Sequence, residues 1–209
     1  MDDAAQALAY AEADFSEPNR LFVDLLEAQA GGALDGHLLD LGCGPADIPV
    51  MLVCRHPGLT VDAVDGAPAM LDLARRKIDA DLGSRVRLIC AHLPCNDLSE
   101  AGYQLIASNS LLHHLADPAV MWQTVRRYAR PGTAVAIMDL ARPASVLAAD
   151  ALVETYALDA PEVLRRDFRN SLFAAYRVDE VERQLHHAGL PTLAVSMISD
   201  RHLAVTGRL

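Results

Sequence analysis

The sequence predicts a doubly wound α/β fold, with a seven-stranded, mostly parallel sheet, an antiparallel terminal hairpin and helices on both faces. Three observations support this prediction. Five apolar stretches of strand length alternate with helical stretches, a pattern typical of a parallel sheet that is covered on both faces. A tight turn with two glycines follows the first of these stretches. Two further strands are joined by a connection too short for a crossover helix.

The elements follow one another regularly along most of the chain. Two leading helices are expected at 3–13 and 20–30. Strands are expected at 38–41, 60–64, 86–90, 105–108 and 134–138, with helices between them at 45–55, 67–82 and 117–129. Residues 143–175 suit one or two helices, a further helix over 178–188 ends at Gly189, and the hairpin strands are expected at 192–198 and 202–206. This hairpin places Asp200, Arg201 and His202 in or beside a turn.

The length of 209 residues favours a single domain over residues 1–209, with residues 1–33 as an N-terminal helical cap. Apolar residues make up 52% of the chain, yet no run approaches the roughly 18 apolar residues of a membrane helix. The acidic N-terminus also lacks the basic start of a signal peptide. We therefore expect a cytoplasmic protein without a membrane partner.

Charge and cysteine content narrow the classes of partner. The net charge of −10, from 18 basic and 28 acidic residues, would repel a phosphate backbone, so nucleic acid is not expected as a partner. The four cysteines, Cys43, Cys54, Cys90 and Cys95, form no C-x-x-C pair and have no histidine at zinc-finger spacing. We expect reduced thiols and no metal site.

The segment from His37 to Asp47 is the most informative part of the chain. An apolar strand ends in an acid, breaks at Gly42 and Gly44, and is followed by a helix whose first N–H groups can hold an anionic ligand group. A second strand ends in Asp65, roughly 20 residues on, where nucleotide-binding folds place the acid that binds the ribose. Together they predict an adenosine-type cofactor. The alternative role for Asp65 is to cap the helix over 67–82.

Three segments resemble motifs of the class I S-adenosylmethionine-dependent methyltransferases. Leu39–Pro45 resembles the first motif of that family, Val64–Met70 the second, and Ser108–Leu115 the segment after the fourth strand. The resemblance extends from Leu34 to Leu209 and includes the terminal antiparallel hairpin. It implies S-adenosylmethionine as the cofactor.

The resemblance also implies roles for individual residues. Asp40, Gly42 and Gly44 would line the methionine end of the cofactor, and Asp65 would accept both ribose hydroxyls. The full set of implied cofactor-binding residues is Asp40, Gly42, Cys43, Gly44, Asp47, Asp65, Gly66, Met70, Ala91, His92 and Asn109. The chain departs from the family at Ala46, where a third glycine is common, and near His92, where many members have an acid.

Two other functions remain open at this stage. A dinucleotide-binding turn would need glycine where the chain has Asp47, whose carboxylate would repel a pyrophosphate but attract the ammonium of a methionine. An NAD(P)-dependent oxidoreductase is therefore the less favoured alternative. A protein that binds S-adenosylmethionine without catalysis is the other.

The acceptor side is expected beside the carboxyl ends of the fourth and fifth strands. His113 and His114 are candidates to remove a proton from the acceptor, although a histidine pair at a helix start also suits capping. The other candidates are Tyr10, Phe15, Asp139 and Arg142, and the helical insertion at 143–175 is expected to cover the acceptor. Arg165–Arg169 would either bind an anionic acceptor or face solvent. We expect a small-molecule acceptor, with no oligomeric state specified.

Overall fold

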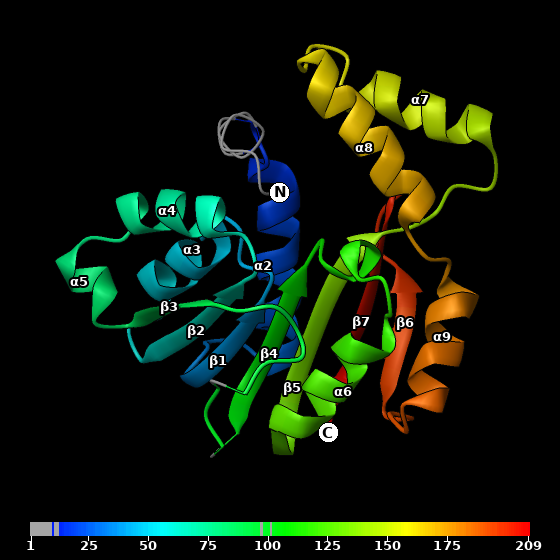
Figure 1. The fold of residues 1–209 in the computed structure, drawn as a ribbon. Coiled ribbons are helices and arrows are strands. Elements are labelled where there is room, and N and C mark those ends of the chain that lie inside the picture. Colours follow the sequence, from blue (N-terminus) through cyan, green and yellow to red (C-terminus); the bar gives the residue numbers. More distant parts are fainter. Residues whose placement is uncertain (1–9, 11–12, 97, 101) are drawn as a thin grey trace.

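The computed structural model describes residue 10 and residues 13–96, 98–100 and 102–209. Its sheet has the strand order β3-β2-β1-β4-β5-β7-β6 (Figure 1). The strands are β1 (Gly36–Leu41), β2 (Leu59–Asp65), β3 (Val86–Cys90), β4 (Tyr103–Asn109), β5 (Ala129–Leu140), β6 (Leu193–Met197) and β7 (His202–Arg208). Strands β1 to β5 pair in parallel, whereas β7 is antiparallel to both β5 and β6. The predicted fold class is confirmed.

Helices pack on both faces of this sheet (Figure 1). They are α2 (Ser16–Ala30), α3 (Asp47–Arg55), α4 (Pro68–Lys77), α5 (Ala80–Gly83), the 3₁₀ turn η1 (Leu112–His114), α6 (Ala119–Tyr128), α7 (Val146–Tyr156), α8 (Glu162–Ala174) and α9 (Val178–His187). Among the described residues, no helix is long and apolar enough to cross a membrane.

Two separate apolar clusters form the core because side chains alternate along each strand. Leu38 belongs to the cluster that includes Phe22 and Leu26 of α2 and Leu52 of α3. The next residue, Leu39, belongs to the cluster on the other face, with residues of α6 and α9. This alternation fixes the register of β1 and thereby carries Asp40 to the carboxyl end of the sheet.

Three predicted boundaries are wrong. The helix expected over 67–82 is broken, because Ile78 has an extended backbone and the Asp79 carboxylate accepts a hydrogen bond from the Leu82 N–H at 2.9 Å, which starts α5 instead. Strand β5 begins at Ala129, which pairs with Tyr103 ahead of a register shift. Helix α2 begins at Ser16 rather than near residue 20. The helix expected over 3–13 lies largely outside the described residues.

Residues 143–175 form α7 and α8, a helix pair with its own small apolar cluster that includes Leu140, Ala149, Val153 and Leu172. Figure 1 shows the pair beyond the carboxyl end of β5, and α8 packs against η1. The pair therefore lies next to the strand ends at which ligands bind in open α/β sheets.

Candidate functional site at the carboxyl ends of the strands

The glycine turn after β1 is held close to the end of β2. The N–H groups of Gly42 and Cys43 donate to the Val64 carbonyl oxygen at 2.8 and 2.9 Å. Gly42 has a φ of 79°, and a Cβ there would come within 3.0 Å of the Leu111 side chain, so glycine is needed for both reasons. Ala46 is also left-handed, with a φ of 63°, a backbone conformation that glycine adopts without strain.

The Asp65 carboxylate joins this turn to α4. Its Oδ2 accepts a hydrogen bond from the Gly44 N–H at 2.8 Å, and its Oδ1 accepts one from the Ala67 N–H, also at 2.8 Å. Ala67 is the N-cap residue of α4, so the capping alternative has a geometric basis. A carboxylate has about four lone-pair sites, however, so both oxygens retain capacity for ribose hydroxyls.

Asp40 is buried at the end of β1, where 2% of its surface stays exposed, and no hydrogen bond from a described residue reaches its carboxylate. Burial, with a smaller contribution from the charge of Asp65, raises the pKa of Asp40 to about 7. The neighbouring Cys43 thiol is also buried, and its pKa is raised by burial and by the same two carboxylates. The thiol is therefore neutral, and Asp40 is a buried acid without a counter-charge from a described residue.

The loop after β3 lies against the end of β2. His92 is exposed, and its ring covers Gly66 so closely that a Cβ on Gly66 would lie 2.5 Å from His92 Nδ1. The Ala91 N–H donates to the Asp65 carbonyl oxygen at 3.1 Å, which fixes this loop over β2. Met70 is buried in a small cluster with Tyr10.

Tyr10 interacts with residues of both the predicted cofactor side and the predicted acceptor side. Its ring lies 4.6 Å from that of Phe15, and burial raises the pKa of Tyr10 to about 12, assisted by the charges of Asp47, Asp65 and Asp139. The electrostatic potential at the Tyr10 hydroxyl therefore depends on carboxylates of α3, β2 and β5.

His113 and Asp139 form a buried pair. His113 Nδ1 lies 2.6 Å from Asp139 Oδ1, and both side chains are almost inaccessible to solvent. The Leu140 N–H donates to the same Asp139 oxygen at 2.7 Å. The second ring nitrogen, His113 Nε2, has no hydrogen-bond partner among the described residues and is not sealed from solvent. The pair thus presents one free imidazole nitrogen.

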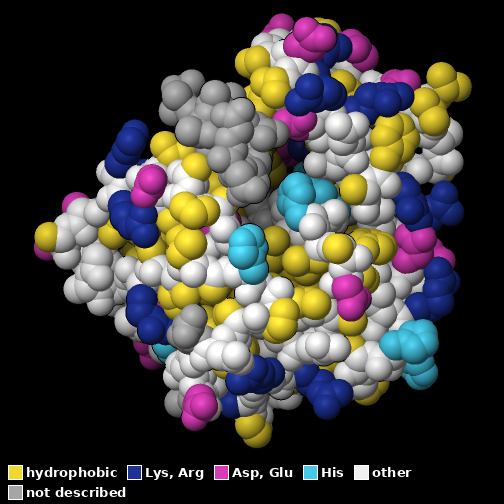
Figure 2. Space-filling view, viewed as in Figure 1, with side chains coloured by type: hydrophobic (Ala, Val, Ile, Leu, Met, Phe, Trp, Pro, Cys, Tyr) yellow, Lys and Arg dark blue, Asp and Glu magenta, His cyan; other side chains and the backbone are white. Residues whose placement is uncertain are grey.

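His114 differs from its neighbour. The two ring centroids are 4.0 Å apart. Desolvation by the surrounding protein, assisted by the charge of His113, lowers the pKa of His114 to about 4. His114 is therefore neutral at physiological pH, although its side chain is exposed. Asn109 ends β4 beside this region, and its Oδ1 accepts a hydrogen bond from the Ser110 hydroxyl at 3.3 Å. Figure 2 shows histidine side chains gathered near the centre of this face.

Several predicted site residues form ion pairs with other side chains of the protein. Asp47 pairs with Lys77 at 2.5 Å, and Arg142 pairs with Glu180 of α9. Two arginines of α8 pair with acids of α7, Arg165 with Glu154 at 2.6 Å and Arg169 with Asp150 at 2.6 Å, whereas Arg166 pairs with Asp167 within α8 at 3.1 Å. Asp40, Asp65, His113, Asp139 and Tyr10 are the residues that the structure brings to the carboxyl-end site.

Arg201 is a residue whose position the sequence did not reveal. It is buried, its guanidinium lies 3.4 Å from the centre of the Tyr156 ring, and it pairs with Glu17 at 2.8 Å and Asp200 at 3.1 Å. The Tyr156 hydroxyl donates to the second oxygen of Asp200 at 2.6 Å. We call this group the Arg201 junction; it joins α2, α7 and the β6–β7 turn.

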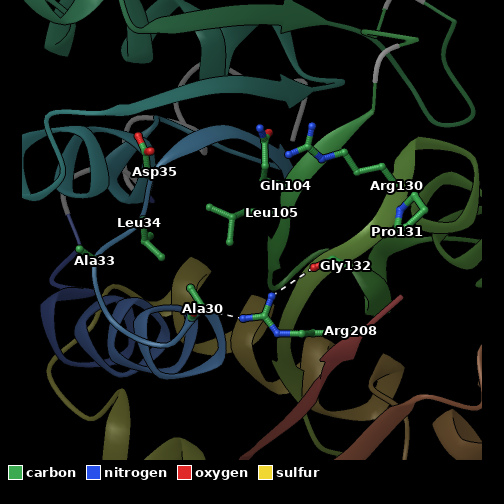
Figure 3. Close-up of a pocket in the computed structure, with 10 residues that line it drawn as sticks. All are labelled: Ala30, Ala33, Leu34, Asp35, Gln104, Leu105, Arg130, Pro131, Gly132 and Arg208. Atoms are coloured by element: carbon green, nitrogen blue, oxygen red, sulfur yellow. Dashed lines mark hydrogen bonds between the residues drawn. The ribbon is translucent and has the colours of Figure 1, made fainter.

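Two hollows lie away from this site. One, of about 420 Å³, lies between α6 and α9. The other, of about 260 Å³, lies at the amino ends of the strands, where Arg208 donates to carbonyl oxygens of Gly132, Gln29 and Ala30 (Figure 3). Arg208 thereby satisfies carbonyl groups at the C-terminal end of α2, a structural role.

The strand order, the glycine turn and the acid at the end of β2 together define a Rossmann-like methyltransferase fold. Residues 38–132 match the family described as Methyltransferase domain. This match covers less than half of the chain, and together with the fold it makes the chain similar to the class I S-adenosylmethionine-dependent methyltransferases, the family that the sequence resembles.

Individual relatives support this assignment. The chain is 30% identical over 135 residues to trans-aconitate 2-methyltransferase from Methylobacterium nodulans, covering 65% of this chain and 48% of the relative. It is 30% identical over 109 residues to malonyl-[acyl-carrier protein] O-methyltransferase from Acetivibrio thermocellus, covering 52% and 36%. It therefore spans less than half of each curated relative. A methyltransferase structure from Aquifex aeolicus matches with a TM-score of 0.70 at 19% identity, covering 97% of both chains.

Proposed function

We propose that this protein transfers a methyl group from S-adenosylmethionine to a small-molecule acceptor. The observation that carries the proposal is the link between the Gly44 N–H and the Asp65 carboxylate, next to the unpaired buried carboxylate of Asp40. The cofactor has an ammonium group, a ribose diol and an adenine, and each has a suitable group here. Trans-aconitate is the small acceptor in the name of one relative.

The residues present fit the cofactor. Asp40 would hold the ammonium group, because a buried acid without a counter-charge gains most from a cation. Asp65 would hold the ribose hydroxyls, and Met70 with His92 would border the adenine. When bound, the cofactor supplies an electrophilic methyl group on a sulfonium. Residues of the chain orient it and keep water away.

His113 would act as the general base of the reaction. Asp139 accepts the hydrogen bond of His113 Nδ1, which leaves Nε2 unprotonated and stabilises the imidazolium that forms when Nε2 takes a proton. The His114 ring lies 4.0 Å from that of His113, Phe15 contacts Tyr10, and Arg142 pairs with Glu180. The roles of these three residues at the acceptor stay predictions. The helix pair α7–α8 would cover the acceptor from the side of η1.

Thermal unfolding tests the cofactor assignment. S-adenosylmethionine at a hundred times its Kd is expected to add about 2.7 kcal/mol to the free energy of unfolding, because it binds the folded state only. NADH at the same concentration should leave the Tm unchanged. Calorimetry that found tight NADH binding and no binding of S-adenosylmethionine would favour the oxidoreductase instead. Binding of S-adenosylmethionine without turnover of any acceptor would favour a non-catalytic binding protein.

A further inference from the structure

We propose that the acceptor carries a weakly acidic hydroxyl, a phenol or an enol, and that it binds in its uncharged form and gives up its proton to His113. This inference rests on the proposed function and narrows it to one class of acceptor. It distinguishes the protein from an enzyme that methylates a carboxylate, a group that is already ionised at neutral pH and needs no base.

The first support is the charge of the carboxyl-end site. Asp40 and Asp65 come from the adjacent strands β1 and β2, Asp139 comes from β5, which β4 separates from β1, and all three lie toward this end of the sheet. Tyr10 senses the charges of Asp65 and Asp139 at once, so the two carboxylates act on a common space. A cationic cofactor is favoured there, whereas an anionic acceptor would be repelled by the same charges.

The second support is the pairing of the arginines around the site. Arg142 pairs with Glu180, Arg201 with Glu17 and Asp200, and Arg165 and Arg169 pair with acids of α7. A carboxylate acceptor would have to share a guanidinium whose charge is already paired with a protein carboxylate. The parts of the chain that the structure does not describe, residues 1–9, 11–12, 97 and 101, contain no lysine or arginine in the sequence.

The third support is the way in which His113 is held. Its Nδ1 is fixed by Asp139 at 2.6 Å, and its Nε2 has no partner among the described residues. This is the arrangement of an imidazole that accepts a proton at one nitrogen and is oriented through the other. A phenol has a pKa of about 10, so an imidazole can take its proton as the oxygen reacts. An aliphatic alcohol is a far weaker acid, and its proton is much harder to remove.

The reaction balances with these groups alone. The hydroxyl proton moves to His113 Nε2, and the oxygen forms a bond to the methyl carbon as the carbon–sulfur bond breaks. The electron pair of that bond stays on sulfur, which becomes a neutral thioether. The imidazolium, held by Asp139, then releases its proton to water. No oxidant, reductant or metal enters the balance.

A functional-group panel tests the inference. Aromatic scaffolds are each supplied as a phenol, a carboxylic acid and an aniline, and transfer of a radiolabelled methyl group from S-adenosylmethionine is measured. We expect products from phenols. His113→Gln should lower kcat by about 100-fold or more while the Kd of S-adenosylmethionine stays within about twofold. His187→Gln, an exposed histidine on α9, is the matched control and should retain full activity.

A second variant distinguishes the loss of a base from a folding defect. His113→Ala removes the imidazole, and added imidazole should restore turnover if the residue acts as a base. Methylation of the carboxylic acids, phenol turnover that does not depend on His113, or no phenol turnover by protein that binds S-adenosylmethionine would each overturn the inference. Absence of S-adenosylmethionine binding would instead overturn the proposed function, so the two failures are distinguishable.

Discussion

Asp40 shows how a single residue can couple cofactor binding to pH. Its carboxyl is buried beside Asp65 and has a pKa raised to about 7 in the free protein. A raised pKa means that the charged form is costly, so this residue lowers the free energy of unfolding as the pH rises from the ordinary range of a carboxyl, near 4, to about 7. A bound ammonium group would remove that cost.

The first residue-scale prediction concerns this coupling. Affinity for S-adenosylmethionine is expected to fall below pH 7, by at most about tenfold per pH unit, because the protonated Asp40 no longer attracts a cation. Calorimetry in buffers of different ionisation enthalpy should detect proton release on binding near pH 7. Asp40→Asn should remove the pH dependence and raise the Tm of the free protein at pH 8. Asp72→Asn, on the exposed side of α4, is the control.

The second residue-scale prediction separates the two roles of Asp65. Asp65→Ala is expected to weaken binding of S-adenosylmethionine by about 1.5 to 3 kcal/mol, the range for hydrogen bonds to a charged group. It should also lower the Tm, because the N–H groups of Gly44 and Ala67 lose their acceptor. Asp79→Ala removes a comparable helix-start hydrogen bond of α5 and should lower the Tm alone. If Asp65→Ala behaves like Asp79→Ala, the residue is only a cap.

At the scale of elements, the Arg201 junction connects the helix pair to the rest of the protein. Besides its packing on α8, α7 is held by Tyr156, whose ring and hydroxyl both contact residues of the junction. The same guanidinium holds Glu17 near the start of α2. The buried guanidinium of Arg201 therefore connects the start of α2 with the end of α7.

The element-scale prediction is that Arg201→Ala loosens α7. Hydrogen exchange in residues 146–156 should accelerate, and the free energy of unfolding should fall by about 2 kcal/mol, the value for a desolvated cation–π contact. Tyr156→Phe keeps the ring and loses only the hydrogen bond to Asp200, so it should cost less. Arg183→Ala, which breaks an exposed pair within α9, is the control. Unchanged exchange in α7 would show that other contacts hold the helix pair.

At the scale of the whole molecule, the sequence predicted what local patterns encode. Strand periodicity and the short connection before β7 predicted the sheet and its hairpin, whereas the role of the acids at the ends of β1 and β2 in cofactor binding stays a prediction. Pairings between distant segments have no local pattern. His113 and Asp139 were each expected at the acceptor, but their mutual contact spans 26 residues. Arg142 was expected there too, yet Glu180, 38 residues away, holds its side chain.

The Arg201 junction illustrates the same limit. A turn was the reasonable interpretation of this segment, since residues 199–201 between the two predicted strands must reverse the chain and His202 follows them directly. No residue near Arg201 in the sequence predicts its contacts with Tyr156 and Glu17, because these contacts form only when distant segments fold together. Long side chains that are charged and buried depend on the complete fold for their partners.

The strand order has a consequence for synthesis of the chain on the ribosome. Strand β7 lies between β5 and β6, although residues 202–208 are made after both neighbours. While those residues are still inside the ribosome, β5 forms the unpaired edge of a five-stranded parallel sheet, and β6 has no strand to join. An open edge of this kind invites pairing with other chains. Until residues 202–208 have left the ribosome, β5 therefore stays an edge open to pairing with other chains.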